Sequence, residues 1–142
     1  MYSDYMHWLV ILLTVSLFIS SRSTRTNGIG LLQTYRVYVI NNFSYDTNEL
    51  MIHCKSGDDD LGYHFLSQYG SWHWKFRVDL FGSTLFFCRV QWGELETSFT
   101  VFDTDYISSK CEGTSTCFWS LREDGIYFSC DDLNYVQRYI WP

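Results

Sequence analysis

The alternation of apolar and polar residues is clearest between Trp72 and Leu80. Within this stretch Trp74, Phe76 and Val78 are also apolar, and a polar residue fills every position between. A period of two is that of a β-strand with one solvent-facing side. A slip of one residue would expose two tryptophans and bury a Lys and an Arg, so the register is strongly specified. We predict that this strand is antiparallel to its neighbours and that the sheet is organised around it.

Further strands are predicted wherever short apolar or β-branched runs are bounded by turn residues. These segments are residues 35–40, 50–55, 63–66, 84–92, 97–102, 117–122 and 126–130. Asp124-Gly125 is a strong two-residue hairpin signal, whereas residues 103–116 predict a long loop and residues 131–142 a polar tail lying on the surface. No window outside the N-terminal segment has a helical period. The sequence therefore predicts an all-β fold, a small two-sheet antiparallel β-sandwich (immunoglobulin-like) with seven to eight strands, stapled by disulfides.

The predicted core is the set of residues on the inward faces of these strands. Their alternation gives a shared aromatic core of Trp72, Trp74, Phe76, Phe86, Val90, Phe99, Val101, Trp119 and Leu121.

The N-terminus has the pattern of a secretory signal. Residues 8–19 are apolar apart from Thr14 and Ser16, and a small-residue region follows at residues 20–23. This run is shorter than the roughly 20 residues that cross a bilayer. The first seven residues carry Asp4 and no Lys or Arg, which keeps an uncleaved anchor as the alternative. We predict a signal peptide at 1–23, a flexible arm at 24–34, and a single domain at 35–142 that is secreted, extracellular and not inserted in a membrane.

The charge of the chain argues against nucleic acid as a partner. The net charge is −6, from 10 Lys+Arg and 16 Asp+Glu, and the basic residues are scattered along the sequence. A basic footprint for phosphate groups is therefore not expected.

Five cysteines follow the predicted signal, and an oxidising compartment favours disulfides over metal chemistry. No metal is predicted, because no Cys-x-x-Cys or His-x-x-x-His spacing exists. Among Cys54, Cys88, Cys111 and Cys117 three pairings are open. Cys54 with Cys117 and Cys88 with Cys111 is favoured because it ties down the long loop. Cys130 would then be a buried free thiol in a monomer, with a Cys130-linked dimer as the alternative.

The remaining polar motifs predict binding or modification rather than catalysis. Three consecutive acids at Asp58, Asp59 and Asp60 cannot all face one calcium ion, so an Asx-type turn is favoured. No Gly-x-Ser-x-Gly elbow accompanies the histidines, and His53 and His73 fall on polar strand faces, where we predict that they are solvated. We predict no catalytic residues and no cofactor. Asn42-Phe43-Ser44 is an N-glycosylation sequon on a predicted surface turn, so Asn42 is the expected glycosylation site.

A succession of short motifs runs along this chain. The motifs are His53-Cys54-Lys55-Ser56, Asp58-Asp59-Asp60-Leu61-Gly62, Trp74-x-Phe76, Thr84-Leu85-Phe86-Phe87-Cys88, Phe99-x-Val101-Phe102, Cys111, Cys117-x-Trp119 and Asp124-Gly125-Ile126-Tyr127. This succession closely resembles the plant self-incompatibility S-protein homologue family. The motifs occur in family order from about Val37 to about Tyr127. The resemblance implies a small secreted β-sandwich with two disulfides, whose namesakes act as stigma-side recognition ligands for pollen. Gly57, where a bulkier or basic residue is usual, and the additional Cys130 depart from the family pattern.

These observations favour a secreted recognition ligand that presents loops to a cell-surface receptor, in pollen–pistil or other reproductive signalling, and we predict that it is not an enzyme. The predicted receptor-facing residues are Lys55, Asp58, Asp59 and Asp60, together with the loop at 103–116. The alternatives are an apoplastic carbohydrate-binding module or enzyme, which would use exposed aromatics such as Trp92, Tyr106 and Trp141, and a defence or inhibitor protein.

Overall fold

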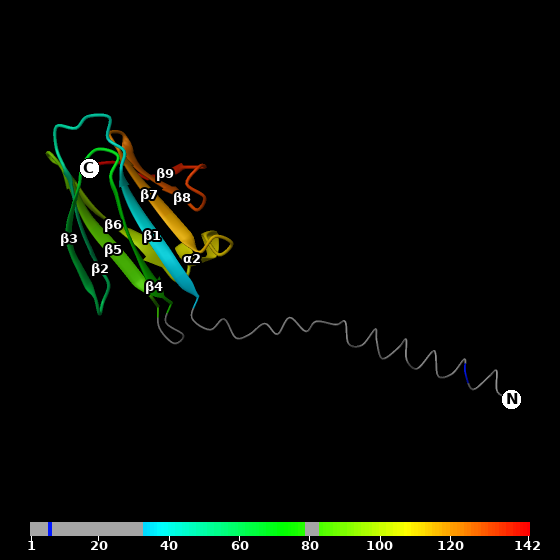
Figure 1. Ribbon diagram of the computed structural model, residues 1–142. Coiled ribbons are helices and arrows are strands. Elements are labelled where there is room, and N and C mark those ends of the chain that lie inside the picture. The colour runs from blue at the N-terminus through cyan, green and yellow to red at the C-terminus, as the bar shows by residue number, and fades with distance from the viewer. Residues whose placement is uncertain (1–5, 7–32, 79–82) are drawn as a thin grey trace. The chain divides into compact units, whose positions relative to one another are not determined.

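The computed structural model describes residues 6, 33–78 and 83–142 (Figure 1). The chain divides into residues 1–31 and residues 32–142, and every described strand lies in the second unit. The predicted signal peptide at 1–23 and most of the arm at 24–34 lie outside the described residues, so both stay predictions. In the part of the chain that is described, no helix is long and apolar enough to cross a bilayer.

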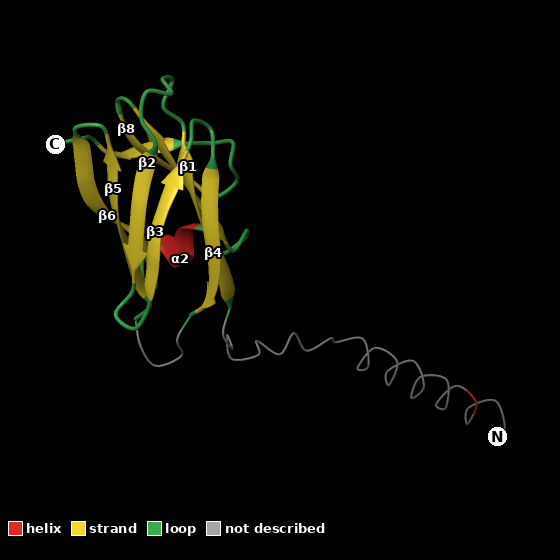
Figure 2. Cartoon of the chain, turned by 60° about the vertical axis from the view of Figure 1, so that its left-hand side comes forward, coloured by secondary structure: helices red, strands yellow, loops and turns green. Residues whose placement is uncertain are grey.

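The described residues form two packed β-sheets (Figures 1 and 2). The five-stranded sheet has the order β4-β1-β7-β8-β9 and the four-stranded sheet the order β3-β2-β5-β6. The elements are β1 (Thr34–Asn41), β2 (Leu50–Lys55), β3 (Asp60–Leu66), β4 (Ser71–Arg77), β5 (Leu85–Trp92), β6 (Leu95–Asp103), the short helix α2 (Ile107–Lys110), β7 (Thr116–Arg122), β8 (Gly125–Ser129) and β9 (Val136–Tyr139). The predicted all-β sandwich is confirmed. The differences are β9 as an additional strand and the parallel pairing of β1 with β7.

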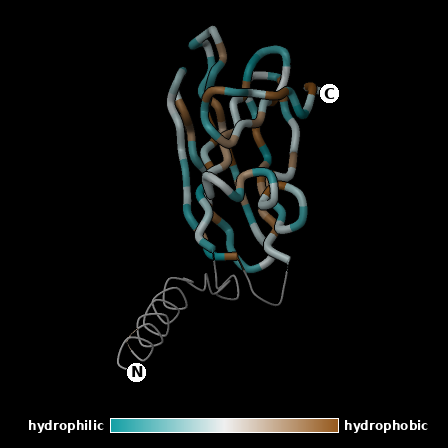
Figure 3. The backbone as a smooth tube through the Cα atoms, turned by 90° about the vertical axis from the view of Figure 1, so that its right-hand side faces the viewer, coloured by the Kyte–Doolittle hydropathy of each residue, from teal (hydrophilic) through white to brown (hydrophobic). Residues whose placement is uncertain are grey.

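The core lies between the sheets and is centred on Trp119 of β7. Trp119 is 1% exposed, and its indole N–H donates a 2.9 Å hydrogen bond across the sandwich to the carbonyl of Val101 in β6. The tube in Figure 3 shows hydrophobic and hydrophilic segments alternating along the strands. The predicted core residues that prove buried are Phe86, Val90, Phe99, Val101, Trp119 and Leu121, whereas Trp72, Trp74 and Phe76 are only partly buried against them.

The strand with the cleanest alternation is an edge strand rather than the centre of its sheet. Among the described strands β4 pairs only with β1, and its residues alternate between exposed and half-buried. The inward direction of Trp72, Trp74 and Phe76 agrees with the prediction, but the central role was wrong. β1 lies between β4 and β7, and its Val37 and Val39 are fully buried. A clean alternation shows that one face of a strand is packed against the core. It does not show whether the strand has a hydrogen-bonded neighbour strand on one side or on both.

Two segments predicted to be irregular contain regular structure. The predicted polar tail holds β9, which pairs with β8, and the ring of Tyr139 lies 5.4 Å from that of Phe99. The long loop holds α2, where the Asp103 carboxylate accepts the backbone N–H groups of Tyr106 and Ile107. Both elements are four residues long, too short for a periodic signal in the sequence.

The disulfides differ from the predicted pairing. Cys54 is bonded to Cys88, and Cys111 to Cys130, which leaves Cys117 as a buried free thiol. The pairings of Cys54 with Cys117 and of Cys88 with Cys111 were therefore wrong. Cys54 and Cys88 lie directly opposite each other on β2 and β5, with Cα atoms 4.0 Å apart. Alternation shows that both face inward, but only strand order and register show that they are neighbours.

The second disulfide changes the prediction for the additional cysteine. Cys130 follows β8 and forms a disulfide with Cys111, the residue after α2. The prediction of a free Cys130 thiol and the alternative of a dimer linked through it were therefore wrong. The free thiol is that of Cys117, whose pKa is raised to about 12 by burial and, to a smaller extent, by the nearby charge of Asp103. Because the thiolate is the reactive form, Cys117 is inert at neutral pH.

Candidate functional site

The acidic segment forms the tight turn between β2 and β3. The Ser56 N–H donates to the carbonyl of Asp59 over 2.8 Å, and the Asp59 N–H donates to the Ser56 hydroxyl over 3.0 Å. These reciprocal bonds are typical of the side chain-stabilised turns that Ser and Asp favour. They fix the backbone of the turn without using the Asp58 or Asp59 carboxylate.

Asp60, the first residue of β3, has a structural role. Its Oδ1 accepts the Gly62 N–H over 2.9 Å and lies 2.7 Å from Nε2 of His53, and its Oδ2 lies 3.7 Å from the Lys55 ammonium. An ionised carboxylate only accepts hydrogen bonds, so His53 carries a proton on Nε2. The Gly62 N–H, followed by His53, lowers the pKa of Asp60. Gly62 has a φ of +77°, a conformation that glycine adopts without strain.

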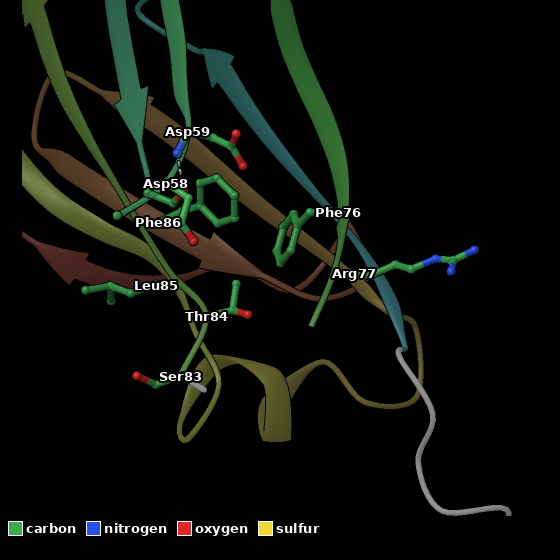
Figure 4. Close-up of a pocket in the computed structure, with 10 residues that line it drawn as sticks. Asp58, Asp59, Phe76, Arg77, Ser83, Thr84, Leu85 and Phe86 are labelled. Atoms are coloured by element: carbon green, nitrogen blue, oxygen red, sulfur yellow. Dashed lines mark hydrogen bonds between the residues drawn. The ribbon is translucent and has the colours of Figure 1, made fainter. Parts of the chain in front are cut away.

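A hollow of about 410 Å³ adjoins this turn (Figure 4). Asp58 and Asp59 line it from the turn, Phe76 from the end of β4, and Phe86 and Thr84 from the start of β5 and the residue before it. The two phenylalanine rings lie 4.6 Å apart, and Phe86 is 4% exposed. Backbone and hydroxyl bonds to Thr104 fix Thr84.

Arg77 also borders the hollow, but its side chain leaves it. Figure 4 shows the guanidinium of Arg77 directed away from Asp58, Asp59 and the phenylalanine rings. This direction follows from strand alternation, because Phe76 faces inward and the next residue must face the outer side of the sheet. The charge that faces the hollow is therefore negative.

The arrangement is suited to binding a basic group on an apolar stem. Within the described residues the carboxylates of Asp58 and Asp59 have no hydrogen-bond or ion-pair partner. A Lys or Arg side chain would place its stem on the half-buried Phe76, against which Phe86 packs, and its charge at the carboxylates, where cation–π attraction adds to the ion pair. The described residues contain no group of three His, Cys, Asp or Glu side chains that could hold a metal ion.

The structure separates the four predicted receptor-facing residues into two groups. Asp58 and Asp59 border the hollow, whereas Lys55 and Asp60 hold each other and the β2–β3 hairpin. The aromatic base of the hollow was predicted as core, but its position beside the acidic turn was not. Phe76 and Phe86 are distant in sequence from the turn, so only the packing of β4 over β5 reveals the site.

Asn42, the predicted glycosylation site, follows directly after β1 and is half-buried. Its side-chain Nδ2 donates a 2.6 Å hydrogen bond to the hydroxyl of Ser120, which is fully buried. The next residue, Phe43, is also fully buried, so the sequon lies against the sandwich rather than on a projecting turn. Glycosylation of Asn42 stays a prediction.

Two of the three aromatics proposed for a carbohydrate platform are used in packing. Trp92 lies flat on Phe43, with ring centroids 4.1 Å apart and an interplanar angle of 3°. Trp141 is half-buried and donates its indole N–H to the Arg122 carbonyl over 2.8 Å. The expectation that Trp92 and Trp141 are exposed was therefore wrong.

Tyr106 is exposed but is engaged by two cations. Its hydroxyl accepts a 2.8 Å hydrogen bond from Arg138, which lowers the tyrosine's pKa, and the ammonium of Lys110 lies 5.3 Å from the ring centroid. These three residues border a second, shallower hollow of about 530 Å³ between α2 and β9. Arg138 and Lys110 therefore cover the face of the Tyr106 ring on which a sugar would otherwise stack.

The histidines are not arranged as a catalytic group. His53 is bound to Asp60 and its side chain is 11% exposed, so the prediction that it is solvated was wrong. His64 stacks on Trp72 with centroids 3.7 Å apart, and exposed His73 stacks on Tyr38. In the hydrogen-bond network of the described residues no serine or cysteine side chain contacts a histidine ring.

Comparison with known proteins shows which family the chain resembles. The model of the plant self-incompatibility protein S1 family matches residues 36–141. S-protein homolog 7 of Arabidopsis thaliana is 32% identical over 117 residues, covering 81% of this chain and 87% of the relative. S-protein homolog 3 of the same plant is 34% identical over 110 residues, covering 76% and 73%.

A solved structure has the same fold. It is described as that of SPH (Self-Incompatibility Protein Homologue) proteins, "a widespread family of small, highly stable, secreted proteins from plants". It superimposes with a TM-score of 0.60 at 22% identity, covering 78% of this chain and 96% of the solved chain. Because the family model spans β1 to the end of β9 and the curated relatives align over most of their length, the chain belongs to the plant self-incompatibility S-protein homologue family.

Proposed function

We propose that the protein is a secreted plant recognition ligand that binds a cell-surface receptor protein through the hollow beside the β2–β3 turn. The observation that carries the proposal is the position of Asp58 and Asp59. Two carboxylates without partners among the described residues border an aromatic hollow, on a turn whose backbone is fixed. Binding residues commonly lie on loops that a rigid scaffold positions.

One disulfide and two hydrogen bonds hold the scaffold beneath the turn rigid. The Cys54–Cys88 bridge joins β2 to β5 two residues before Ser56, and Asp60 holds the other side of the turn through His53 and Gly62. A loop held in this way loses little conformational entropy on binding, so more of its contact energy remains as affinity.

The chemistry of the hollow favours a basic segment of the receptor. A Lys or Arg side chain satisfies both the carboxylates and the aromatic surface, whereas an acidic partner would be repelled. The family's name associates its members with self-incompatibility, and pollen–pistil or other reproductive signalling is therefore the setting we propose first.

The same observations favour a ligand over the alternatives. The predicted carbohydrate platform would need the faces of Trp92, Tyr106 and Trp141 to be free, but Trp92 and Trp141 are packed and Tyr106 is covered by cations. We also propose that the protein is not an enzyme, because no described histidine lines the hollow beside Asp58 and Asp59, and among the described residues no serine or cysteine side chain contacts a histidine ring. A defence or inhibitor role is tested separately, by protease inhibition assays.

Saturation binding of the labelled secreted protein to intact reproductive and vegetative tissue tests the proposal. We expect a saturable, tissue-restricted signal that is lost when surface proteins are removed by brief proteolysis, and proximity labelling should then identify a membrane receptor. Binding that survives proteolysis and is competed by a neutral sugar, or turnover in a hydrolase panel, would contradict it.

A further inference from the structure

Three adjacent strands of the five-stranded sheet contain no acidic residue. β4, β1 and β7, with the sequences SWHWKFR, TYRVYVIN and TCFWSLR, lack Asp and Glu, although the chain has 16 acidic and 10 basic residues. The same strands carry Arg36, Lys75, Arg77 and Arg122. Basic residues that are scattered in sequence are thus gathered by the strand order β4-β1-β7.

Three of these cations form a row on the outer face of the sheet. Arg36 of β1 lies directly opposite Lys75 of β4, and Arg77 lies two residues further along β4, opposite Thr34. All three are exposed. Two positions along a strand are separated by about 6.6 Å, and directly opposite Cβ atoms by about 5 Å. Like charges at opposite positions destabilise a sheet, so this arrangement has a cost.

Nothing in the described chain offsets that cost. Lys55 and Arg89 have carboxylate partners at Asp60 and Glu96. Arg36, Lys75 and Arg77, in contrast, make no ion pair or side-chain hydrogen bond with any described residue. No described carboxylate pairs with the row, which leaves these cations open to a negatively charged partner molecule.

We propose that the Arg36–Lys75–Arg77 row binds an acidic polysaccharide of the plant extracellular matrix, a chain of uronic acid residues. A polymer with a carboxylate on successive sugars can meet several cations of a row at once, as phosphates do along a nucleic acid strand. The rings of His73, Tyr38 and Phe118 lie beside the row, but each covers its neighbour's face at centroid distances of 4.6 and 5.0 Å. The contact therefore depends on carboxylates whose spacing along the polymer matches that of the cations in the row, rather than on sugars stacked against exposed rings.

The proposal rests on an extracellular location and is independent of the receptor contact at the hollow. Arg77 points away from the hollow, and Asp58 and Asp59 are not part of the row. Binding to matrix polysaccharide would retain the secreted ligand near its site of release.

Titration of the secreted protein with soluble polygalacturonate at several salt concentrations tests the proposal. Three neutralised cations predict a slope of log K against log salt of about −2, so a tenfold rise in salt weakens binding about a hundredfold. The R36Q/K75Q variant should bind at least roughly tenfold more weakly in low salt and reduce the slope by about 1.4. The K55Q/R89Q variant changes the net charge equally on the other sheet and should stay within about twofold of wild type.

Four results would overturn the proposal once thermal melts have shown that both variants are folded. They are no binding of the wild type in low salt, equal weakening by the control variant, equal binding of fully methyl-esterified polygalacturonate, and equal affinity for polyglutamate or duplex DNA of matched charge. The last two would show, respectively, that charge is not the basis of binding and that the row does not select a polysaccharide.

Discussion

Replacing Cys111 and Cys130 together by serine removes the bridge that ties α2 to the end of β8. The bonded residues are 19 positions apart, and Cys111 is 1% exposed. Without the bridge, α2 is held mainly by Ile107 in the core and by the hydrogen bonds that the Asp103 carboxylate accepts from the Tyr106 and Ile107 N–H groups. The Cys54–Cys88 bridge is untouched, so the variant isolates one cross-link.

The expected loss follows from loop closure in the unfolded chain. Cross-linking a loop of this length removes about 11 cal/mol/K from the unfolded ensemble, or about 3 kcal/mol at 25 °C. For a domain of this size that corresponds to a fall in Tm of about 12 °C, at about 4 °C per kcal/mol. The same relation gives about 4 kcal/mol for removal of the Cys54–Cys88 bridge, which closes a longer loop.

Urea denaturation without reductant measures the free energy of unfolding, and a C117A variant serves as control because it keeps both bridges. The control should lose less than about 2 kcal/mol. A loss below about 1 kcal/mol for C111S/C130S would refute the reasoning. Non-reducing peptide mapping that joined Cys111 to Cys117 or to Cys88 would refute the pairing itself.

Three further outcomes are expected. The F43A variant should lose about 3–5 kcal/mol in urea denaturation, because fully buried Phe43 stacks on Trp92, and a loss under 1 kcal/mol would contradict this role. Cys117 should resist iodoacetamide at pH 8 until the protein unfolds, because burial raises its pKa to about 12; rapid labelling of the native protein would show an open site. Hydrogen bonds from Asn134, Leu133 and Ser129 lower the pKa of Asp131, so its contribution to stability is present above the unfolded pKa of about 4 and is lost as the pH falls towards the folded value. The stability difference between wild type and D131N should therefore shrink on acidification, and a difference that is constant from pH 7 to pH 2 would exclude this linkage.

The alternation of residues predicted strand faces well, because burial of one face is a local property of each strand. Phe86, Phe99 and Trp119 were assigned to the core on this basis and are buried. The same signal could not rank strands by position, and β4, with the cleanest period, proved to be an edge strand.

Neighbours across strands could not be predicted, because they depend on register and strand order rather than on any local pattern. Alternation predicted that Cys54 and Cys88 face inward. They are bonded to each other because they lie directly opposite on β2 and β5, which alternation does not show. Arg36 and Lys75 are likewise far apart in the sequence but directly opposite each other in the sheet.

The candidate site was predicted only in part for the same reason. The acidic turn was recognised from its sequence, and the Asp60 carboxylate accepts the Gly62 N–H as in the predicted Asx-type turn, whereas the additional bonds of Ser56 were not predicted. Which acids are free was not predictable, because Asp60 is occupied by His53 and Gly62 through the pairing of β2 with β3. The aromatic base of the hollow required the packing of the two sheets.

The receptor proposal is tested most directly by the cell-surface affinity of the D58N/D59N variant. D46N/E94Q is the matched control, since it removes two exposed carboxylates from the β1–β2 loop and the β5–β6 turn. If two carboxylates contact a basic receptor segment, D58N/D59N should raise the Kd at least tenfold, while the control stays within about twofold of wild type. Equal affinity of wild type and D58N/D59N would contradict the assignment of this hollow as the receptor contact.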